Sequence, residues 1–387
     1  MSQNLKKQSE RLQTWLRHKA LPLWEKVAID ENGGWYESLD LASEPHTDSV
    51  RRLRVQARQI YVYSLAQKMG WHKAESLINR SVDFLIKYGF EPDSNPGFIH
   101  RLGPNYDITD GRRDFYDHAF FLLASGWAYY AVGNLKALTL ISKTTDFIEG
   151  ELSSPEKGWL EAKPHKGPRR QNPHMHFLEA SMALYDMSGD RKWMDYAHHV
   201  FNLFKAHFFD DSHHIIREYF KEDWSPLNTP KGQSVEPGHA AEWVWLLKRY
   251  EERSGIDTSD YAQKLYDRIC DTSTTFLNDE EQIDGTPIRT TKRLWVQTEF
   301  IKAHLAQANR YPKTVKAMAA QNKAADTINA LLDTYLRENG TWIDQTDKSG
   351  RPVSKTVPTS TFYHIICMID EVYAGTKLPT TESLEVN

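Results

Sequence analysis

Polar side chains that suit proton transfer recur along the chain in short clusters, each followed by apolar residues. The clusters contain histidines, an arginine, an asparagine and glutamates, with tyrosine and tryptophan close by. The candidate binding or catalytic residues among them are Arg58, Tyr116, Asn172, His176, His239, Glu242, Trp295, Glu299 and His364. Because histidine titrates near neutral pH, these clusters predict acid/base chemistry on a small polar substrate.

Two of the clusters repeat one spacing. His176 and Glu179 lie three residues apart, as do His239 and Glu242, so each pair shares one face of a helix. A carboxylate beside an imidazole holds one tautomer and tunes the basicity of the ring. We therefore expect each glutamate to support its histidine; the alternative for such a pair is a solvated helix surface.

Arg58 interrupts a segment that otherwise has the pattern of a buried helix. A buried guanidinium needs a carboxylate or the oxygens of a ligand as its partner. Two interpretations follow: Arg58 binds the substrate, or it forms a structural ion pair with Glu242 or Glu299. Tyr116 and Trp295 suit either ordinary packing or stacking against the C–H faces of a sugar.

Metal binding is the minority interpretation. His176, His239, His364 and a glutamate could surround Zn²⁺. The chain has, however, no His-Glu-x-x-His segment, and its two cysteines cannot form a zinc ligand set or a disulfide framework. It also lacks a Gly-x-Gly-x-x-Gly turn and a Walker A sequence, so we expect no metal and no cofactor.

The stretch 163–170 is basic, with Lys166, Arg169 and Arg170. We interpret it as a solvated loop. Because the stretch comes shortly before His176, contact with an anionic substituent of the substrate is the alternative.

Period-3.6 patterns predict the elements that must position these side chains. About twelve helices are expected, near residues 9–27, 50–69, 71–88, 115–132, 135–152, 174–187, 192–208, 238–253, 259–278, 292–309, 312–336 and 361–374. Very short connections alternate with long ones that hold the few strand-like pieces, such as 214–219, as in repeated helical hairpins. Six hairpins of about 64 residues predict an all-α fold, an (α/α)6 barrel; an open solenoid would show a sequence period, and none is found.

The candidate side chains gather at the starts of every second predicted helix. If alternate helices line the interior of the barrel, these groups converge at one end of one cavity. Scattered core histidines have no reason to choose alternate helices, so the pattern favours one site. His364 alone has the character of a packed core histidine, and only its place in this pattern assigns it to the site.

The composition bounds the partners. The 387 residues are 40% hydrophobic and 12% aromatic, enough for a sizeable core and a partly aromatic pocket. Lys and Arg total 48 against 52 Asp and Glu, a net charge of −4, which argues against nucleic acid. No apolar segment reaches the roughly 18 residues of a membrane span, and the start has no signal-peptide core. We expect a single domain over 1–387, located in the cytoplasm, monomeric or homodimeric, with no nucleic-acid or membrane partner.

Taken together, these residues resemble those of the N-acylglucosamine 2-epimerase superfamily, which includes metal-independent mannose isomerases, sulfoquinovose isomerases and cellobiose 2-epimerases. The matching segments are Gln-Ala-Arg-Gln-Ile-Tyr around Arg58, Tyr-Asp-His-Ala-Phe at 116–120, Asn-Pro-His-Met-His-Phe-Leu-Glu at 172–179, Pro-Gly-His-Ala-Ala-Glu-Trp at 237–243, and His364. The resemblance covers nearly the whole chain and also implies an (α/α)6 barrel. The first two segments are closest to the mannose isomerase branch.

The resemblance implies roles for these residues. His239 and His364 would be the acid/base pair, and the residues that hold the sugar would be Arg58, Asn172, His176, Glu242 and Trp295. One histidine can remove the C2 proton of an open-chain aldose; return of that proton to C1 gives the ketose through a cis-enediol. Its return to the opposite face of C2 gives the epimer, and both reactions need the same two residues.

We therefore expect an aldose–ketose isomerase that interconverts D-mannose and D-fructose. The first alternative is a 2-epimerase acting on mannose or on an N-acylated sugar. Two alternatives come from other classes: a glycoside hydrolase, which would need two opposed carboxylates such as Asp117, Glu242 or Glu299, and a non-catalytic helical scaffold.

Overall fold

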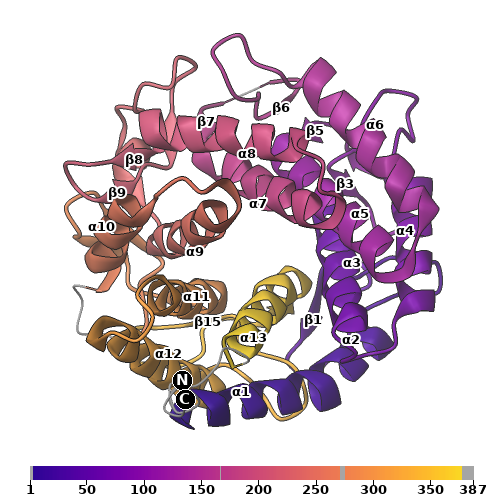
Figure 1. Cartoon of the computed structure of the whole chain (residues 1–387). Helices are drawn as coiled ribbons and strands as arrows, with labels where there is room; N and C mark the ends of the chain where they lie inside the picture. Colours follow the sequence, from indigo (N-terminus) through magenta and orange to yellow (C-terminus); the bar gives the residue numbers. More distant parts are fainter. Residues whose placement is uncertain (1–2, 166, 271–274, 377–387) are drawn as a thin grey trace, which may run out of the picture.

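Helices alternate between two concentric rings in the computed structural model, which describes residues 3–165, 167–270 and 275–376 (Figure 1). The inner ring consists of α3 (Leu53–Lys68), α5 (Phe115–Val132), α7 (Gln171–Ser188), α9 (Pro237–Ser254), α11 (Leu294–Arg310) and α13 (Phe362–Thr376). The outer ring consists of α1 (Gln3–Trp15) with α2 (Leu21–Val27), then α4 (Glu75–Gly89), α6 (Leu135–Glu151), α8 (Lys192–Leu203), α10 (Ser259–Cys270) and α12 (Val315–Thr334). The expected (α/α)6 barrel is confirmed.

Burial patterns separate the two rings. In α3 every residue from Val55 to Ala66 is buried, because other helices or the site cover it on all sides. In α12 the buried residues instead recur at helical spacing, from Ala317 through Ala324 to Leu331, and form a single apolar stripe. Contacts between α13 and α3 close the inner ring, and contacts of α1 with α12 close the outer one.

Short antiparallel strands fix the starts of the inner helices. Six pairs join each long connection to the next around the ring: β1 (Ser38–Asp40) with β16 (Thr356–Pro358), β2 (Arg51–Arg52) with β3 (Arg101–Leu102), β5 (Arg113–Asp114) with β6 (Ala162–Lys163), β7 (Arg169–Arg170) with β10 (Tyr219–Phe220), β11 (Ser234–Val235) with β12 (Glu280–Gln282), and β14 (Lys292–Arg293) with β15 (Gln345–Thr346). In addition, β4 (Ile108–Asp110) extends β3, β13 (Pro287–Arg289) extends β12, and β8 (Phe209–Asp210) pairs with β9 (Ile215–Ile216). Each inner helix begins within a few residues of one of the six pairs, so all six N-termini meet at one end of the barrel.

The opposite end has tight links. Gly133 and Gly189 directly follow the inner helices α5 and α7. Both have a φ of 68°, a left-handed conformation that suits glycine and ends a helix. The next outer helix starts almost at once, which explains why short and long connections alternate.

Several predicted boundaries are wrong. The helix expected at 9–27 begins at Gln3 and contains a π-helical turn, Leu16–Ala20, because Pro22 has no N–H for the regular hydrogen-bond ladder. A second π turn, Phe204–Phe208, follows α8. The helices expected from residues 50 and 292 start at Leu53 and Leu294, because the preceding arginines join strands β2 and β14.

Other differences lie in the connections. The expected 214–219 strand is two strands, β9 and β10, separated by Arg217 and Glu218. Residues 275–278 are not helical, and positions 271–274 of that expected helix lie outside the described residues. Short 3₁₀ turns, Pro230–Gln233 and Thr359–Thr361, precede β11 and α13. None of the helices in the described part of the chain is both long and apolar enough to cross a membrane.

Candidate active site

The N-terminal ends of the inner helices surround a cavity of about 340 Å³. Eight of the nine predicted site residues line it: Arg58, Tyr116, Asn172, His176, His239, Glu242, Trp295 and His364. Each comes from the first two turns of its helix, where the strand pairs hold the backbone. The ninth, Glu299, is fully buried behind His364 instead of facing the cavity.

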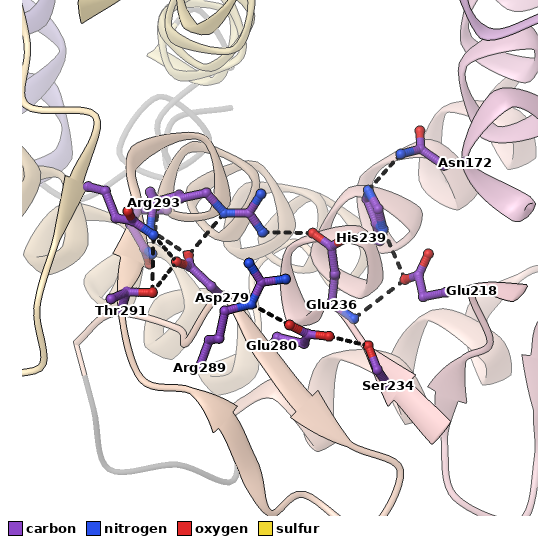
Figure 2. A network of polar contacts seen from close by, with 12 residues as sticks. Asn172, Glu218, Ser234, Glu236, His239, Asp279, Glu280, Arg289, Thr291 and Arg293 are labelled. Atoms are coloured by element: carbon purple, nitrogen blue, oxygen red, sulfur yellow. Dashed lines mark hydrogen bonds and ion pairs between the residues drawn. The ribbon is translucent and has the colours of Figure 1, made fainter. Parts of the chain in front are cut away.

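His239 is held from both sides (Figure 2). Its Nδ1 lies 2.9 Å from Oε1 of Glu218, and its Nε2 lies 3.1 Å from the side-chain amide of Asn172. The Gln171 side chain donates to the other oxygen of Glu218 at 2.9 Å and accepts from the Trp243 indole at 2.8 Å. The carboxylate and the ring are therefore fixed before any substrate binds.

Glu218 replaces the partner expected from the sequence. The expectation that Glu242 supports His239 is wrong, because the Nδ1 edge of the ring faces the β10 connection and not the next turn of α9. Burial alone would lower the pKa of His239, but the charges of Glu218 and Glu236 outweigh it and raise the pKa to about 9. The ring is therefore an imidazolium at neutral pH, and the Asn172 amide must then turn its Oδ1, which has no other hydrogen-bond partner among the described residues, toward the Nε2–H.

His364 has the opposite electrostatic environment. Its Nδ1 lies 2.8 Å from Oε1 of Glu299, whose Oε2 lies 2.6 Å from the ammonium nitrogen of Lys302. Burial, together with the charges of Arg58 and Lys302, holds the pKa of His364 well below its usual range. His364 is thus a neutral imidazole. The Trp295 indole contacts both histidines, with 5.4 Å between its centroid and that of each ring.

Arg58 is bound by neutral groups. Its Nη2 donates to the Tyr116 hydroxyl at 2.7 Å, its Nη1 donates to the Ser360 carbonyl at 3.3 Å, and the guanidinium carbon lies 4.3 Å from the centroid of the Phe120 ring. Within the described chain no ion pair joins Arg58 to a carboxylate, so the predicted alternative, a pair with Glu242 or Glu299, is wrong. An unneutralised guanidinium on the cavity wall can bind substrate oxygens.

The His176–Glu179 pair forms as its spacing predicts, with 3.1 Å between Nδ1 and Oε2. The Tyr363 hydroxyl also donates to this carboxylate. Burial alone would raise the pKa of Glu179, but the hydrogen bond and charge of His176 lower it to about 2. Burial has the opposite effect on a histidine, and it lowers the pKa of His176.

Glu242 is a buried carboxyl group whose oxygens have no hydrogen bond to the described residues; Nδ1 of His176 lies 4.0 Å from Oε1. Burial and the neighbouring charge of Glu299 raise its pKa well above the usual range, which favours the protonated form. A neutral carboxyl at the cavity wall can donate a hydrogen bond to a substrate oxygen.

Two groups of side chains have the geometry to hold a cation. In His176, Glu179 and Glu242, and in Glu242, Glu299 and His364, the potential ligand atoms lie within 4.8 Å of one another. A cation would have to displace the proton of Glu242 and compete with the existing histidine–glutamate hydrogen bonds. The absence of a metal stays a prediction.

Sequence reasoning missed Glu218 and Lys302. Lys302 had a local signal, since it follows Glu299 by three residues and so shares its helical face. Glu218 had none, because β10 brings it to His239 from another connection. The cavity wall also includes four charged residues that were not predicted: Arg52, Glu236, Arg293 and Asp344.

Two of the three carboxylates named for the hydrolase alternative do not line the cavity. Asp117 is bound by Arg54 at 3.0 Å and by His100 at 2.6 Å, away from the cavity. Glu299 is also behind the wall, so Glu242 is the only one of the three proposed carboxylates that faces the cavity.

Comparisons with known proteins agree with this geometry. The sequence profile described as N-acylglucosamine 2-epimerase (GlcNAc 2-epimerase) matches residues 33–368. The chain belongs to this family. It is 32% identical to a mannose-6-phosphate isomerase of Rhizobium meliloti (strain 1021), with 96% of this chain and 98% of the relative covered. The resemblance found in the sequence is therefore confirmed.

Two other similar proteins carry further names. A D-mannose isomerase of Thermobifida fusca is 27% identical over 61% of this chain and 62% of its own length. The solved structure of cellobiose 2-epimerase from Spirochaeta thermophila DSM 6192 superposes with a TM-score of 0.85 at 22% identity, covering 96% of this chain and 97% of that one. The protein is therefore a member of a family of sugar isomerases and epimerases.

Proposed function

We propose that the protein is an aldose–ketose isomerase that interconverts D-mannose and D-fructose. The observation that carries this proposal is the pair of histidines that line one cavity and both contact Trp295, one charged and one neutral. Each has its Nδ1 on a buried carboxylate, so proton exchange falls to Nε2, which in His239 also meets the Asn172 amide. The two family members named as isomerases of mannose or of its 6-phosphate support the same reaction.

The charged ring suits the opening of the pyranose. Opening requires the ring oxygen to gain a proton while the C1 hydroxyl loses one to solvent. His239, an imidazolium at neutral pH, supplies the first proton. Arg58 and the protonated Glu242 then donate hydrogen bonds to the sugar oxygens and stabilise the negative charge that develops there.

The neutral ring suits carbon deprotonation. Nε2 of His364 takes the C2 proton, the electron pair of that C–H bond forms the C1–C2 double bond, and the carbonyl oxygen gains a proton from a donor on the wall. The resulting cis-enediol gives the proton on O2 back to that same donor, and His364 returns its own proton to C1. Solvent, which took the proton of the C1 hydroxyl, reprotonates His239, so these steps give the ketose and restore the enzyme.

A 2-epimerase is the competing function. It would use the same deprotonation, after which His239 would deliver a proton to the opposite face of C2. The charged state of His239 is compatible with that step, so the choice of isomerase rests on the names of the relatives and on the single base that a 1,2-transfer needs.

Product analysis tests the proposal. D-Mannose is taken to equilibrium, mannose, fructose and glucose are resolved by chromatography, and a parallel reaction in D₂O is followed by NMR. We expect fructose as the main product, with deuterium confined to C1 of fructose and C2 of mannose. Rapid early glucose with only a trace of fructose would establish the epimerase, reducing sugar released from an oligosaccharide would establish a hydrolase, and no turnover of any free sugar would favour a scaffold.

A further inference from the structure

A second cavity, of about 240 Å³, lies at the end of the barrel opposite the sugar site. Inner helices α3, α5, α7, α9 and α13 line it through side chains of their middle and last turns (Figure 1). The sugar site is at the starts of the inner helices, and no described residue lines both cavities. Tyr130 and Asp186, which line the second cavity, are exposed. A solute can therefore reach this separate space from the end with the tight links.

Three aromatic rings form a corner of this cavity. Trp127 is nearly perpendicular to Tyr61 and to Tyr130, with interplanar angles of 80° and 81° and centroid distances of 5.4 and 5.9 Å. Tyr61 is buried and Tyr130 is exposed, so the corner runs from the inner end of the cavity to its rim. Perpendicular rings around one space are the arrangement of the aromatic cages that bind methylated ammonium groups through cation–π contacts.

Acidic side chains outnumber basic ones on the rest of the wall. Among the described lining residues the acids are Glu179, Asp186, Asp370 and Glu371, and the one base is Arg249. Arg249 lies 2.9 Å from Glu371 and 3.6 Å from Asp186. Behind the wall, Arg253 also binds Asp186, at 2.8 Å. Two arginines thus meet four acids, which leaves an excess of negative charge.

Glu179 carries part of this charge at the inner end of the cavity. It is 6% exposed, and burial alone would raise its pKa, but His176 lowers that pKa to about 2, so the group is ionised. Its hydrogen-bond donors are His176 and the Tyr363 hydroxyl. Because burial lowers the pKa of His176, neither donor brings a positive charge at neutral pH. Within the described chain the carboxylate thus has no cation in direct contact, which favours a cationic occupant.

Aromatic rings of this wall already attract cations of the chain. Nζ of Lys302 lies 3.6 Å from the centroid of the Trp245 ring, and Nζ of Lys68 lies 3.8 Å from that of Tyr130. In the part of the chain that the structure describes, no cation lies over Trp127, the central ring of the corner. This ring is therefore left for a ligand.

Trp245 can donate a hydrogen bond to the occupant. Its side chain lines the cavity and is 5% exposed, and its indole Nε1 has no hydrogen-bond partner among the described residues. A buried donor is costly to leave unpaired. An occupant that carries an acceptor oxygen is therefore favoured.

We propose that this cavity binds a small quaternary ammonium ion that carries a hydroxyl group, such as choline. The methylated nitrogen lies in the aromatic corner, with Glu179 as its counter-charge, and the hydroxyl oxygen accepts a hydrogen bond from Trp245. A neutral sugar would also stack on aromatic rings, but the excess of carboxylates favours a cation. The inference goes beyond the proposed function and does not depend on which sugar reacts.

Two ligands of the same shape test the role of the charge. Titration calorimetry of the full-length protein compares choline with its uncharged isostere, in which carbon replaces the nitrogen. We expect choline to bind at least about 10-fold more tightly, because the rings and the carboxylate attract the cation. No binding of choline, or equal binding of the two ligands, would overturn the inference.

Two ring deletions locate the ligand. Trp127→Leu and Tyr130→Leu keep an apolar side chain, and each should weaken the binding of choline by about 5-fold or more. Tyr130 is 44% exposed, so its replacement leaves the core intact even if melting temperatures show that the loss of Trp127 destabilises the fold. Tyr129→Leu, which removes an exposed ring of the same helix that does not line the cavity, is the matched control. Wild-type affinity in both ring variants would place choline elsewhere and overturn the inference.

Trp245→Phe tests the hydroxyl group of the ligand. The change removes the indole N–H and keeps an aromatic ring. The wild type should bind choline more tightly than tetramethylammonium, which has no hydroxyl, and the variant should lose this difference. A difference that persists in the variant would overturn the hydrogen bond assigned to Trp245.

Discussion

Lys302 lies one helical turn from Glu299, and 2.6 Å separates its Nζ from Oε2 of that carboxylate. Both side chains are fully buried in α11, and the other oxygen of Glu299 holds Nδ1 of His364. Burial raises the pKa of Glu299, whereas the ammonium group opposes that rise. Lys302 is therefore a positioning residue, because it keeps an ionised acceptor against the N–H of His364.

Replacement of Lys302 should impair turnover more than substrate binding. In Lys302→Met, Glu299 loses its counter-charge and takes up a proton, so Nδ1 of His364 no longer faces an anionic acceptor. We expect kcat to fall by about 10-fold or more with little change in KM. Steady-state kinetics and the melting temperature, measured on the same preparation, check this.

A double variant separates positioning from stability. Removal of one partner of a buried ion pair costs about 3–5 kcal/mol, whereas removal of both costs much less. Glu299→Gln/Lys302→Met should therefore melt at a higher temperature than Lys302→Met and still turn over slowly. A Lys302→Met variant with a lower melting temperature but wild-type kcat would refute the positioning role.

Local patterns predicted the ring of helices and the positions of most site residues. Apolar periodicity is a property of each helix alone, and six strand pairs then bring the helix starts to one end. The same reasoning gave the contact between His176 and Glu179, since a spacing of three residues places both on one helical face.

Contacts between connections could not be predicted in this way. Glu218 reaches His239 because β10 pairs with β7, with Tyr219 opposite Arg170, and nothing near either residue in the sequence specifies that register. The rule of three-residue spacing therefore chose Glu242, the wrong partner for His239. Arg58 shows a related limit, because its partners, Tyr116 and Ser360, lie on other elements.

The two histidines should both be needed for turnover. His239→Asn and His364→Asn keep a polar side chain of similar size but cannot exchange a proton near neutral pH. We expect each change to lower kcat by about 10²-fold or more, the usual contribution of a general acid or base. Circular dichroism should be unchanged, and a variant with near-full turnover would show that its histidine is only a packed core residue.

Chelation should leave the activity intact. The mechanism proposed above uses side chains and solvent for its proton transfers, and burial favours the protonated form of Glu242, which belongs to both potential cation groups. We expect full turnover after prolonged treatment with EDTA or dipicolinate followed by desalting. Loss of activity that one added divalent ion restores would assign a metal to these residues and overturn the two-histidine mechanism.

Acid should destabilise the fold well before its carboxylates titrate. Burial lowers the pKa of His174 and of His304 to about 3 each, so both are neutral in the folded protein. In the unfolded chain they bind protons near pH 6.5, the ordinary histidine value. The free energy of unfolding must therefore fall as the pH falls from about 6.5 toward 3.

Melting temperatures between pH 7.5 and pH 5 check this dependence. His304→Phe replaces a ring packed against Phe300 with an aromatic ring that does not titrate, so the decrease with acid should be smaller. His213→Gln, at an exposed position, should behave like the wild type. Melting temperatures independent of pH over this range would show that these histidines are not kept neutral by folding.

Glu218 should set the alkaline limit of activity. The pKa of His239 is about 9 because Glu218 and Glu236 outweigh the effect of burial, whereas the pKa of His364 lies well below its usual range. If turnover needs His239 charged and His364 neutral, kcat/KM should be constant from about pH 6.5 to 8 and fall near pH 9. Glu218→Gln keeps a hydrogen-bond acceptor for Nδ1 but removes the charge, so it lowers the pKa of His239. The alkaline limb should then move down by about one pH unit or more, with the loss of activity greatest at pH 8 and smallest near pH 6.

Glu222→Gln is the control for this measurement. It removes a carboxylate that pairs with His165 outside the cavity, and its pH profile should match that of the wild type. An alkaline limb that stays in place in Glu218→Gln would mean that a group other than His239 titrates there, and the assignment of His239 as the charged acid would have to be abandoned.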